Sequence, residues 1–246
     1  MNTKVVPVLA LSALCSANAY SETASLSLGA FMTNKSSVYQ GGESQNTPYP
    51  FIDAYWGPLF ISNGQAGSFI AGSDQWGLAL AIGLADLEDK SRDNSKQLKG
   101  MHKLNTVFVG TVQSFIETGY GQFTAGFEQD ISNQHKGYSA NIGYSFSLEL
   151  GHWLIEPAIS ATWINDDISE YYYGVNQNEV SSTRAAYQPG SASYLNTELN
   201  LVYFFNRNHA LALGISHNQL SKEISNSPIV NHTRSTSVMA GYVYSF

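Results

Sequence analysis

The sequence TSVMAGYVYSF, residues 236–246, predicts a β-strand with two unlike faces. Side chains alternate across a strand, so one face carries Val238, Ala240, Tyr242, Tyr244 and Phe246. The opposite face carries mostly smaller residues. A soluble protein would expose the apolar face as an aggregation-prone edge, whereas a transmembrane β-barrel needs such a face against lipid. The stretch therefore favours a membrane barrel.

The two ends of the chain agree with this interpretation. Tyr242, Tyr244 and Phe246 resemble the terminal signal by which the barrel assembly machinery of Gram-negative bacteria recognises its substrates. Residues 1–19 predict a secretory signal peptide, with Lys4, an apolar run and a cleavage site at Ala17 and Ala19. The apolar run is shorter than the roughly 20 residues of a membrane-spanning helix. We expect residues 20–246 to form a single outer-membrane barrel domain.

Composition narrows the class of protein further. Charged residues make up 13% of the 246 residues, against about 25% in soluble domains. Aromatic residues also make up 13%, and the formal net charge of −7 argues against nucleic acid as a partner. Cleavage of the signal peptide would remove the one cysteine, Cys15, and with it any disulfide or thiol chemistry.

Further segments repeat the alternation of the closing strand. Trp153 and Trp163 lie ten residues apart on one face of an alternating segment, and about ten residues cross a bilayer as a tilted strand. Residues 24–32, 75–84, 138–148, 195–205 and 211–215 also predict strands. A soluble sandwich is the alternative, but it would place its large apolar residues inward. The fold class is all-β, an antiparallel transmembrane β-barrel.

Connections of two lengths set the strand count. Short turns are predicted at 57–58, 72–74, 113–115, 149–152 and 206–208, and long, mobile surface loops at 33–48, 85–102, 129–137, 164–190 and 220–233. If both ends are periplasmic, the number of strands is even, and residues 49–71 cross the membrane once or three times. Because Gly57-Pro58 and Asn63-Gly64 are both good turn sites, the sequence predicts twelve strands, with ten as the alternative.

Two motifs then resemble a known family. Tyr172-Tyr173-Gly174-Val175 follows a polar loop, and Ser227-Pro228-Ile229-Val230 precedes the closing strand. Together they resemble the MipA/OmpV family of Gram-negative outer-membrane barrels. The resemblance implies a cell outer-membrane location, and because the sequence shows no convincing catalytic or ligand-binding group, we expect neither enzymatic activity nor a cofactor. The resemblance also implies a scaffold that docks a lytic transglycosylase and a murein synthase on the periplasmic side.

Two other functions stay open. One is a narrow pore for small, possibly cationic, solutes, because Glu149, Glu156 and Glu198 are predicted to point inward from three successive strands and carboxylates favour cations. Glu117 would join them if its strand has the same phase. Arg184 or Arg207 would instead neutralise these carboxylates if the interior is cross-linked. The other function is an adhesin or host-contact surface built from the long loops.

Three further groups of residues could have either a functional or an ordinary structural role. Tyr171-Tyr172-Tyr173 predicts either a contact surface or packing at the barrel rim. Asp166-Asp167 with His217 could imitate an acid–histidine protease pair, but two adjacent carboxylates in an Asn/Ser-rich loop are more often ordinary solvated turn residues, which is the interpretation favoured here. The histidines show no metal-ligand spacing, so no metal site is predicted.

Overall fold

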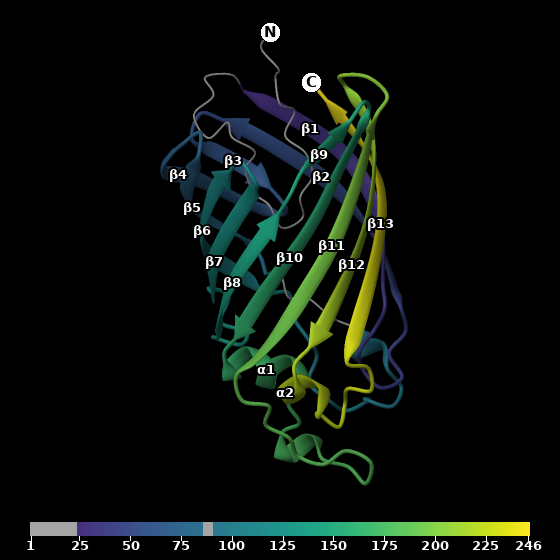
Figure 1. Cartoon of the computed structure of the whole chain (residues 1–246). Helices are drawn as coiled ribbons and strands as arrows, with labels where there is room; N and C mark the ends of the chain where they lie inside the picture. The colour runs from purple at the N-terminus through teal and green to yellow at the C-terminus, as the bar shows by residue number, and fades with distance from the viewer. Residues whose placement is uncertain (1–23, 86–90) are drawn as a thin grey trace.

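The computed structural model describes residues 24–85 and 91–246. They form a closed antiparallel β-barrel, with Ala24 and Phe246 at one end and long loops at the other (Figure 1). The predicted signal peptide, residues 1–19 with its cleavage site at Ala17 and Ala19, lies outside the described residues. No helix in the described part of the chain is long and apolar enough to cross a membrane.

Each strand pairs with the next along the chain, except that β8 and β9 both pair with β10, and the last strand pairs with the first to close the barrel. The strands are β1 (Ser25–Lys35), β2 (Gln45–Trp56), β3 (Leu59–Ser62), β4 (Gln65–Ser73), β5 (Trp76–Leu84), β6 (Phe108–Thr118), β7 (Gly121–Asp130), β8 (Tyr138–Ser145), β9 (Leu148–Leu150), β10 (Trp153–Ile164), β11 (Ala192–Phe204), β12 (His209–Leu220) and β13 (Arg234–Ser245).

Strands β8 and β9 are two parts of one crossing. Both pair with β10, β8 through Ser145 and Ala158 and β9 through Leu148 and Ile155. Pro157 lies at the break between them: its carbonyl accepts a hydrogen bond from the Phe146 N–H (3.1 Å), but proline has no N–H to return one. The described chain therefore crosses twelve times. The prediction of twelve strands is confirmed, and the alternative of ten is wrong.

The three short crossings predicted before β5 are present as β2, β3 and β4. They are joined by turns at Gly57-Pro58 and Asn63-Gly64, the sites that the sequence indicated. Asn63 and Gly64 have φ angles of 51° and 74°, as expected for a type I′ hairpin turn. Because this turn comes so early, β3 has only four residues.

The two faces of the wall follow the predicted alternation. On β13, Val238 and Tyr242 are 50% and 44% exposed, whereas Met239 and Val243 are 6% and 5% exposed. Outward apolar side chains recur around the barrel, whereas the inward face is mixed: small, polar and acidic residues alternate there with two buried clusters that include Phe31, Phe51, Phe60, Phe69 and Phe115. An outward apolar band is what lipid requires.

One predicted turn is wrong. Residues 113–115 lie in the middle of β6, and the turn comes later, at Gly119 and Tyr120. Gln113 points into the barrel, where its amide donates a hydrogen bond to Gln65 Oε1 (3.1 Å). A polar side chain facing the lumen therefore looked like a turn residue in the sequence. Placing β6 in this way also puts Glu117 on the inward face, beside Gln122.

The sidedness of β12 can be tested with two neighbouring residues. Ile215 faces outward and is 48% exposed, while Ser216 faces the lumen opposite Glu198. We expect Ile215→Lys to lower the free energy of unfolding in lipid by about 2–4 kcal/mol, because it places a charge in hydrocarbon. Ser216→Lys should cost much less. Reversible urea unfolding in vesicles measures both, and equal losses would contradict the assigned faces.

Candidate functional site

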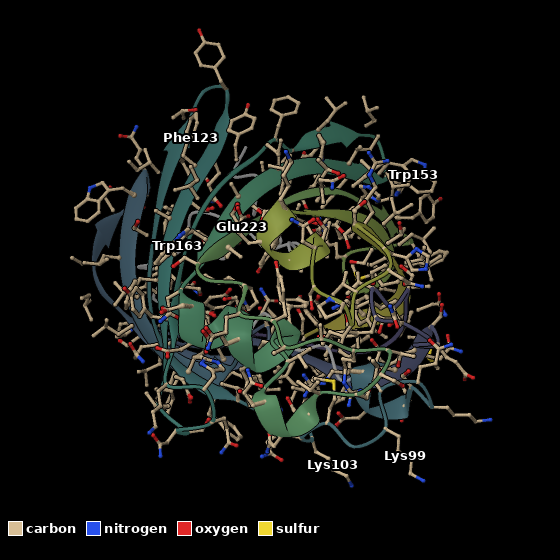
Figure 2. The ribbon with its side chains drawn as sticks, turned by 90° about the horizontal axis from the view of Figure 1, so that it is seen from below. Lys99, Lys103, Phe123, Trp153, Trp163 and Glu223 are labelled. Carbon is tan, nitrogen blue, oxygen red and sulfur yellow. The ribbon has the colours of Figure 1, made fainter. Side chains whose placement is uncertain are left out.

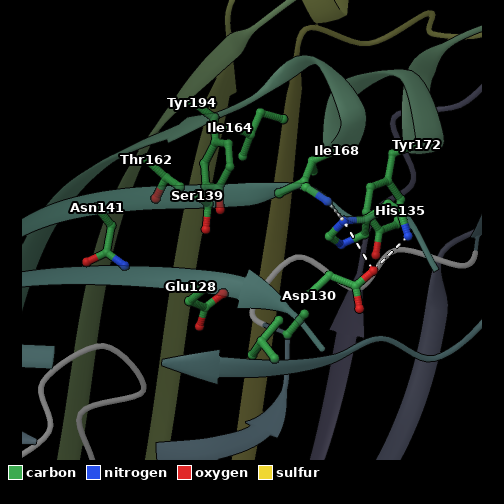
Figure 3. A pocket seen from close by; sticks show the side chains of 13 residues that line it. Glu128, Asp130, His135, Ser139, Asn141, Thr162, Ile164, Ile168, Tyr172 and Tyr194 are labelled. Atoms are coloured by element: carbon green, nitrogen blue, oxygen red, sulfur yellow. Dashed lines mark hydrogen bonds and ion pairs between the residues drawn. The ribbon is translucent and has the colours of Figure 1, made fainter. Parts of the chain in front are cut away.

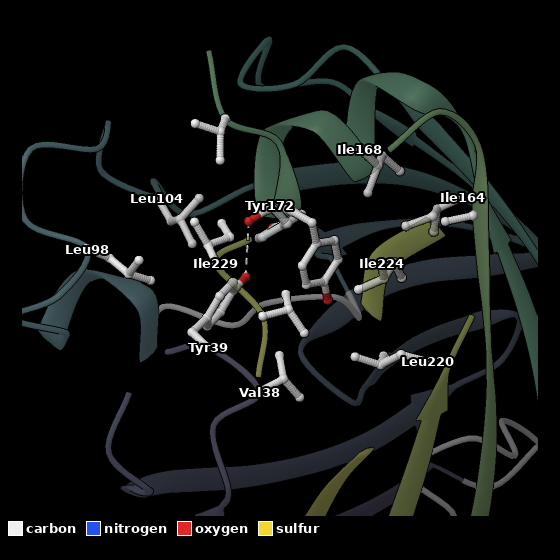
Figure 4. Packing of buried hydrophobic residues seen from close by; sticks show 14 residues of the cluster. Val38, Tyr39, Leu98, Leu104, Ile164, Ile168, Tyr172, Leu220, Ile224 and Ile229 are labelled. Atoms are coloured by element: carbon white, nitrogen blue, oxygen red, sulfur yellow. Dashed lines mark hydrogen bonds between the residues drawn. The ribbon is translucent and has the colours of Figure 1, made fainter. Parts of the chain in front are cut away.

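The long loops pack into a cap over the end of the barrel away from Phe246. This loop cap consists of residues 36–44, 91–107, 165–191 and 221–233. Seen from this end, its helices lie across the barrel mouth, while Lys99 and Lys103 point away from it (Figure 2). The cap has its own buried apolar cluster, part of which Figure 4 shows: Val38, Tyr39, Leu98, Leu104, Ile164, Ile168, Tyr172, Tyr173, Val175, Ala192, Leu220, Ile224, Ile229 and Val230.

This cluster corrects the expectation of mobile loops. Tyr39, Tyr172 and Ile229 are at most 1% exposed, which is burial typical of a domain core. The loops hold short helices, namely η1 (Ser91–Asn94), α1 (Asp166–Tyr173), η2 (Gln177–Glu179) and α2 (Lys222–Ser225). The loop cap is therefore a packed lid.

Helix α1 places the tyrosine triplet in this lid. Asn165 caps the helix, its Oδ1 accepting a hydrogen bond from the Ile168 N–H (3.3 Å), and Asp166 and Asp167 add favourable charge to the first turn. Tyr172 and Tyr173, on the last turn, are 1% and 2% exposed. Of the two interpretations of the triplet, packing is confirmed for these two side chains and an exposed contact surface is wrong for them.

The two family motifs meet inside the cap. Ser227 Oγ donates a hydrogen bond to the Tyr173 carbonyl (2.6 Å), and the ring of Tyr173 stacks on Tyr39 with centroids 5.8 Å apart. Tyr39 in turn forms a β-bridge with Val230. Segments 172–175 and 227–230, which are far apart in the sequence, thus pack against the same loop. Their role in this structure is to close the cap.

Arg92 is a central cap residue that sequence reasoning missed. Its side chain is 1% exposed, and its guanidinium donates to the carbonyls of Tyr171 (3.2 Å), Tyr172 (3.1 Å) and His102 (2.7 Å). Arginine suits this position because its fixed fork of donors can serve several carbonyls at once. In the sequence, Arg92 lies among other charged residues and is indistinguishable from a solvated loop charge.

A second polar contact ties the same loops together. Glu179, which is 5% exposed, accepts hydrogen bonds from the N–H of His102 (2.7 Å) and pairs with its ring Nδ1 (2.8 Å). Burial alone would raise the pKa of Glu179, but these hydrogen bonds and that from the Asn176 N–H outweigh it, so the pKa lies below its usual value. The carboxylate is therefore charged at neutral pH, and it joins η2 to residues 91–107.

A small cavity lined by both apolar and polar side chains lies directly beneath the cap (Figure 3). Its volume of about 20 Å³ is enough for one or two water molecules. Asp130 accepts hydrogen bonds from the N–H groups of Ser132, His135 and Lys136 (2.7–2.8 Å), which fixes the β7–β8 loop. Burial lowers the pKa of His135 more than Asp130 and Asp167 raise it, so the imidazole is neutral at pH 7.

The lumen below is lined by acidic side chains. Glu156 and Glu198 lie on the inward face of adjacent strands β10 and β11, and Glu149 lies inward near the short-turn end, where it is exposed. Asp53 and Glu128, which the sequence reasoning did not single out, are also inward and buried. Their period-two position on β2 and β7 was the signal that could have found them.

Basic side chains do not balance these carboxylates. Within the described strands, the only lysine or arginine residues are Lys35 and Arg234, which lie at the cap end of β1 and β13. Arg184, considered as a partner, instead donates from Nε to the Glu179 carbonyl (2.8 Å) in the cap, and Arg207 lies in the β11–β12 turn. Neutral donors serve the acids: Ser147 for Glu156 (2.9 Å) and Asn200 for Glu198 (2.8 Å).

The structure assigns ordinary roles to the residues considered for catalysis. Asp166 and Asp167 form the first turn of α1, and Asp167 accepts a hydrogen bond from Asn165 (2.9 Å). His217 Nδ1 instead lies 3.1 Å from Thr236 Oγ1, on the wall of the barrel. Across residues 24–85 and 91–246, no group of three or more potential ligands could hold a metal ion.

Comparison with known proteins places this barrel among outer-membrane proteins. The outer membrane protein Omp26La of Vibrio anguillarum is 28% identical over 63% of this chain and 60% of its own length, so the match spans less than two thirds of that relative. The MltA-interacting protein of Escherichia coli K12 is 23% identical over 89% of this chain and 90% of its own. An outer membrane channel from Pseudomonas putida F1 has 10% identity and a TM-score of 0.44, covering 95% of this chain and all of that one.

The family comparison covers almost the whole described barrel. The family described as "MltA-interacting protein MipA" matches residues 27–246, from β1 to the terminal phenylalanine. This match confirms the resemblance drawn from the tyrosine and Ser-Pro-Ile-Val motifs. Together with the relatives, it also confirms an outer-membrane location. The chain belongs to the MipA family of outer-membrane β-barrel proteins.

Proposed function

We propose that this protein is a non-catalytic scaffold that holds a lytic transglycosylase and a murein synthase at its periplasmic rim. Outer-membrane barrels place their short turns in the periplasm and their long loops outside. In this orientation the loop cap closes the outer end, so partners would meet the protein from the periplasmic side. Similarity to the MltA-interacting protein supports a partner of this kind.

The observation that carries the proposal is the set of exposed aromatic side chains at the short-turn end. Trp56, Tyr120, Phe205 and Phe246 are 74%, 83%, 56% and 73% exposed, and they lie at three different turns and at the end of the chain. Large aromatic side chains dominate the binding energy of many interfaces. A rim of such anchors lets short turns bind a partner without a separate periplasmic domain.

The remaining partners follow from the barrel itself. The outward apolar band would be covered by outer-membrane lipid. Tyr242, Tyr244 and Phe246 lie at the periplasmic end of β13, where the barrel assembly machinery would recognise them during insertion.

Site-specific photocrosslinking in intact cells tests the scaffold. With benzoylphenylalanine in place of Tyr120, we expect a murein hydrolase and synthase to be captured several-fold above the level at Phe123. Phe123 is the matched control, because it is an aromatic residue of the same hairpin and is 50% exposed on the lipid-facing wall. Equal capture at the two positions, or none at Tyr120, would refute docking at this rim.

A second function, passage of small cations, is supported by the acidic lumen and by the lack of basic side chains between the ends of the described strands. Rings of carboxylates favour cations in pores. The loop cap would have to move for solutes to pass. Arg92 is the residue whose removal should loosen it, because three carbonyls would lose their donor and the buried one, that of Tyr172, would be left unsatisfied at a cost of about 1–3 kcal/mol.

Planar-bilayer recordings test this second function. We expect little conductance from the wild-type barrel, and a cation-selective current from Arg92→Met. Adding Glu156→Gln and Glu198→Gln should reduce that selectivity. Lys99→Ala is the control, since it removes an exposed charge from the same loop. An Arg92→Met barrel that conducts no more than the Lys99→Ala barrel, or whose selectivity ignores the two glutamates, would exclude the cation route.

A further inference from the structure

Strand β2 has a paired strand along only part of one edge. On one edge, β2 pairs with β1 over eleven residues, from Gln45 to Tyr55. On the other edge it pairs with β3 only through Ala54, Tyr55 and Trp56. Among residues 24–85 and 91–246, no strand pairs with positions 45–53 on this second edge, which is here termed the β2 interval.

The sequence of β2 is adapted to an edge without a partner. The Leu26 carbonyl accepts from the Phe246 N–H (3.0 Å) and the Ser36 N–H donates to the Thr236 carbonyl (2.9 Å), so the even-numbered residues of β1 bond toward β13. Its odd-numbered residues therefore bond toward β2, and in the observed register they face odd-numbered residues there. The backbone of even-numbered β2 residues consequently points into the β2 interval.

Two of those even-numbered residues are Pro48 and Pro50. Proline has no N–H, so at these positions the free edge lacks the donors that a neighbouring strand would need. In sheets, proline is confined to edges and bulges for this reason. Unpaired backbone is costly in hydrocarbon and is tolerated where it lines a cavity or contacts protein. The two prolines thus reduce the cost of leaving this edge unpaired and prevent the sheet from closing over it.

The interval has a defined lower end. The Asn63-Gly64 turn stops β3 after four residues, and Ser62 Oγ donates a hydrogen bond to the Asp53 carboxylate (2.5 Å) at that level. This contact fastens the tip of the β3–β4 hairpin to β2. Above Asp53, β2 continues for eight more residues, back to Gln45, without a paired strand on this side.

The surroundings of the β2 interval are apolar outside and aromatic inside. Outward side chains on its two sides include Met32, Ile52 and Ile61, which are 45–51% exposed. Inward, Phe31 stacks on Tyr49 and packs edge-on against Phe51, with ring centroids 5.5 Å apart in both pairs. On the other side, Phe60 packs with Phe69 at 5.2 Å. An apolar chain passing from lipid to these rings would meet the unpaired backbone of the even-numbered β2 residues, where Pro48 and Pro50 lack an N–H.

We infer that the β2 interval is a lateral portal, through which an acyl chain of a membrane lipid enters the barrel and contacts Phe31, Tyr49 and Phe51. The occupant is a lipid chain because the part of the interval from Pro48 to Ile52 lies level with the outward side chains of Met32 and Leu28 and carries no basic side chain that would select a charged group. This activity is separate from the scaffold, since it uses the wall and not the periplasmic rim.

Quenching by brominated lipid tests the portal. Cys15, the one cysteine of the sequence, lies in the predicted signal peptide, so a single cysteine placed in residues 20–246 can be labelled uniquely. Phe51→Cys, labelled with bimane, reports from inside the barrel beside the interval. Val202→Cys is the matched control, because Val202 is also inward but lies behind complete pairing with Leu154 and Ala212. Leu213→Cys, on the lipid face, gives the maximum quenching expected from brominated lipid.

In vesicles whose phosphatidylcholine carries bromine on its acyl chains, we expect the label at position 51 to be quenched several-fold more than the label at position 202. The extent of its quenching should approach that of the label at position 213. Tyr49→Cys repeats the test if Phe51→Cys does not fold, as judged by heat-modifiable migration. Aqueous iodide separates the two routes of access. Quenching at 51 and 49 no greater than at 202, or quenching there by iodide alone, would overturn the portal.

Discussion

The structure depends on the pairing of its first and last strands. In a bilayer every backbone N–H and C=O must be satisfied within the protein, and a sheet meets this requirement by closing. The nine residue pairs between β1 and β13 provide that closure. Once the barrel is closed, the period of two assigns each strand residue to lipid or to lumen. The outward apolar band and the inward carboxylates are consequences of this single constraint.

Closure also brings the distant loops together. Strands β10 to β13 and β1 are consecutive neighbours in the wall, so the loops 165–191, 221–233 and 36–44 emerge side by side. Their apolar residues can then form a common core, in which Tyr173 meets Ser227 and Tyr39 meets Val230. Arg92 adds a donor to three carbonyls of this core. A barrel capped in this way leaves only its short-turn end uncovered by the packed loops.

Local sequence pattern was sufficient for the wall and insufficient for the cap. Alternation predicted the faces of β13, and turn sites together with the parity of crossings predicted twelve strands, because both signals depend on neighbours in sequence. Local pattern misplaced a turn at Gln113, because a lumen-facing polar residue and a turn residue have the same local signature. It could not predict the burial of Arg92 or Tyr172, since both depend on loops that meet only after closure. The inward position of Asp53 and Glu128 could be predicted only from the alternation of their strands, and polar residues in those segments obscured that alternation.

Hydrogen exchange of the barrel in lipid nanodiscs tests the closed outer end most directly. Within the loop cap, the Val175 N–H bonds to the Tyr187 carbonyl (2.9 Å) and the Tyr187 N–H to the Val175 carbonyl (3.1 Å). If the cap is a packed lid, these amides exchange slowly, at rates close to those of the barrel strands and far below those of the exposed residues around Lys99. Exchange of the Val175 and Tyr187 amides as fast as that of the Lys99 segment would contradict a closed cap.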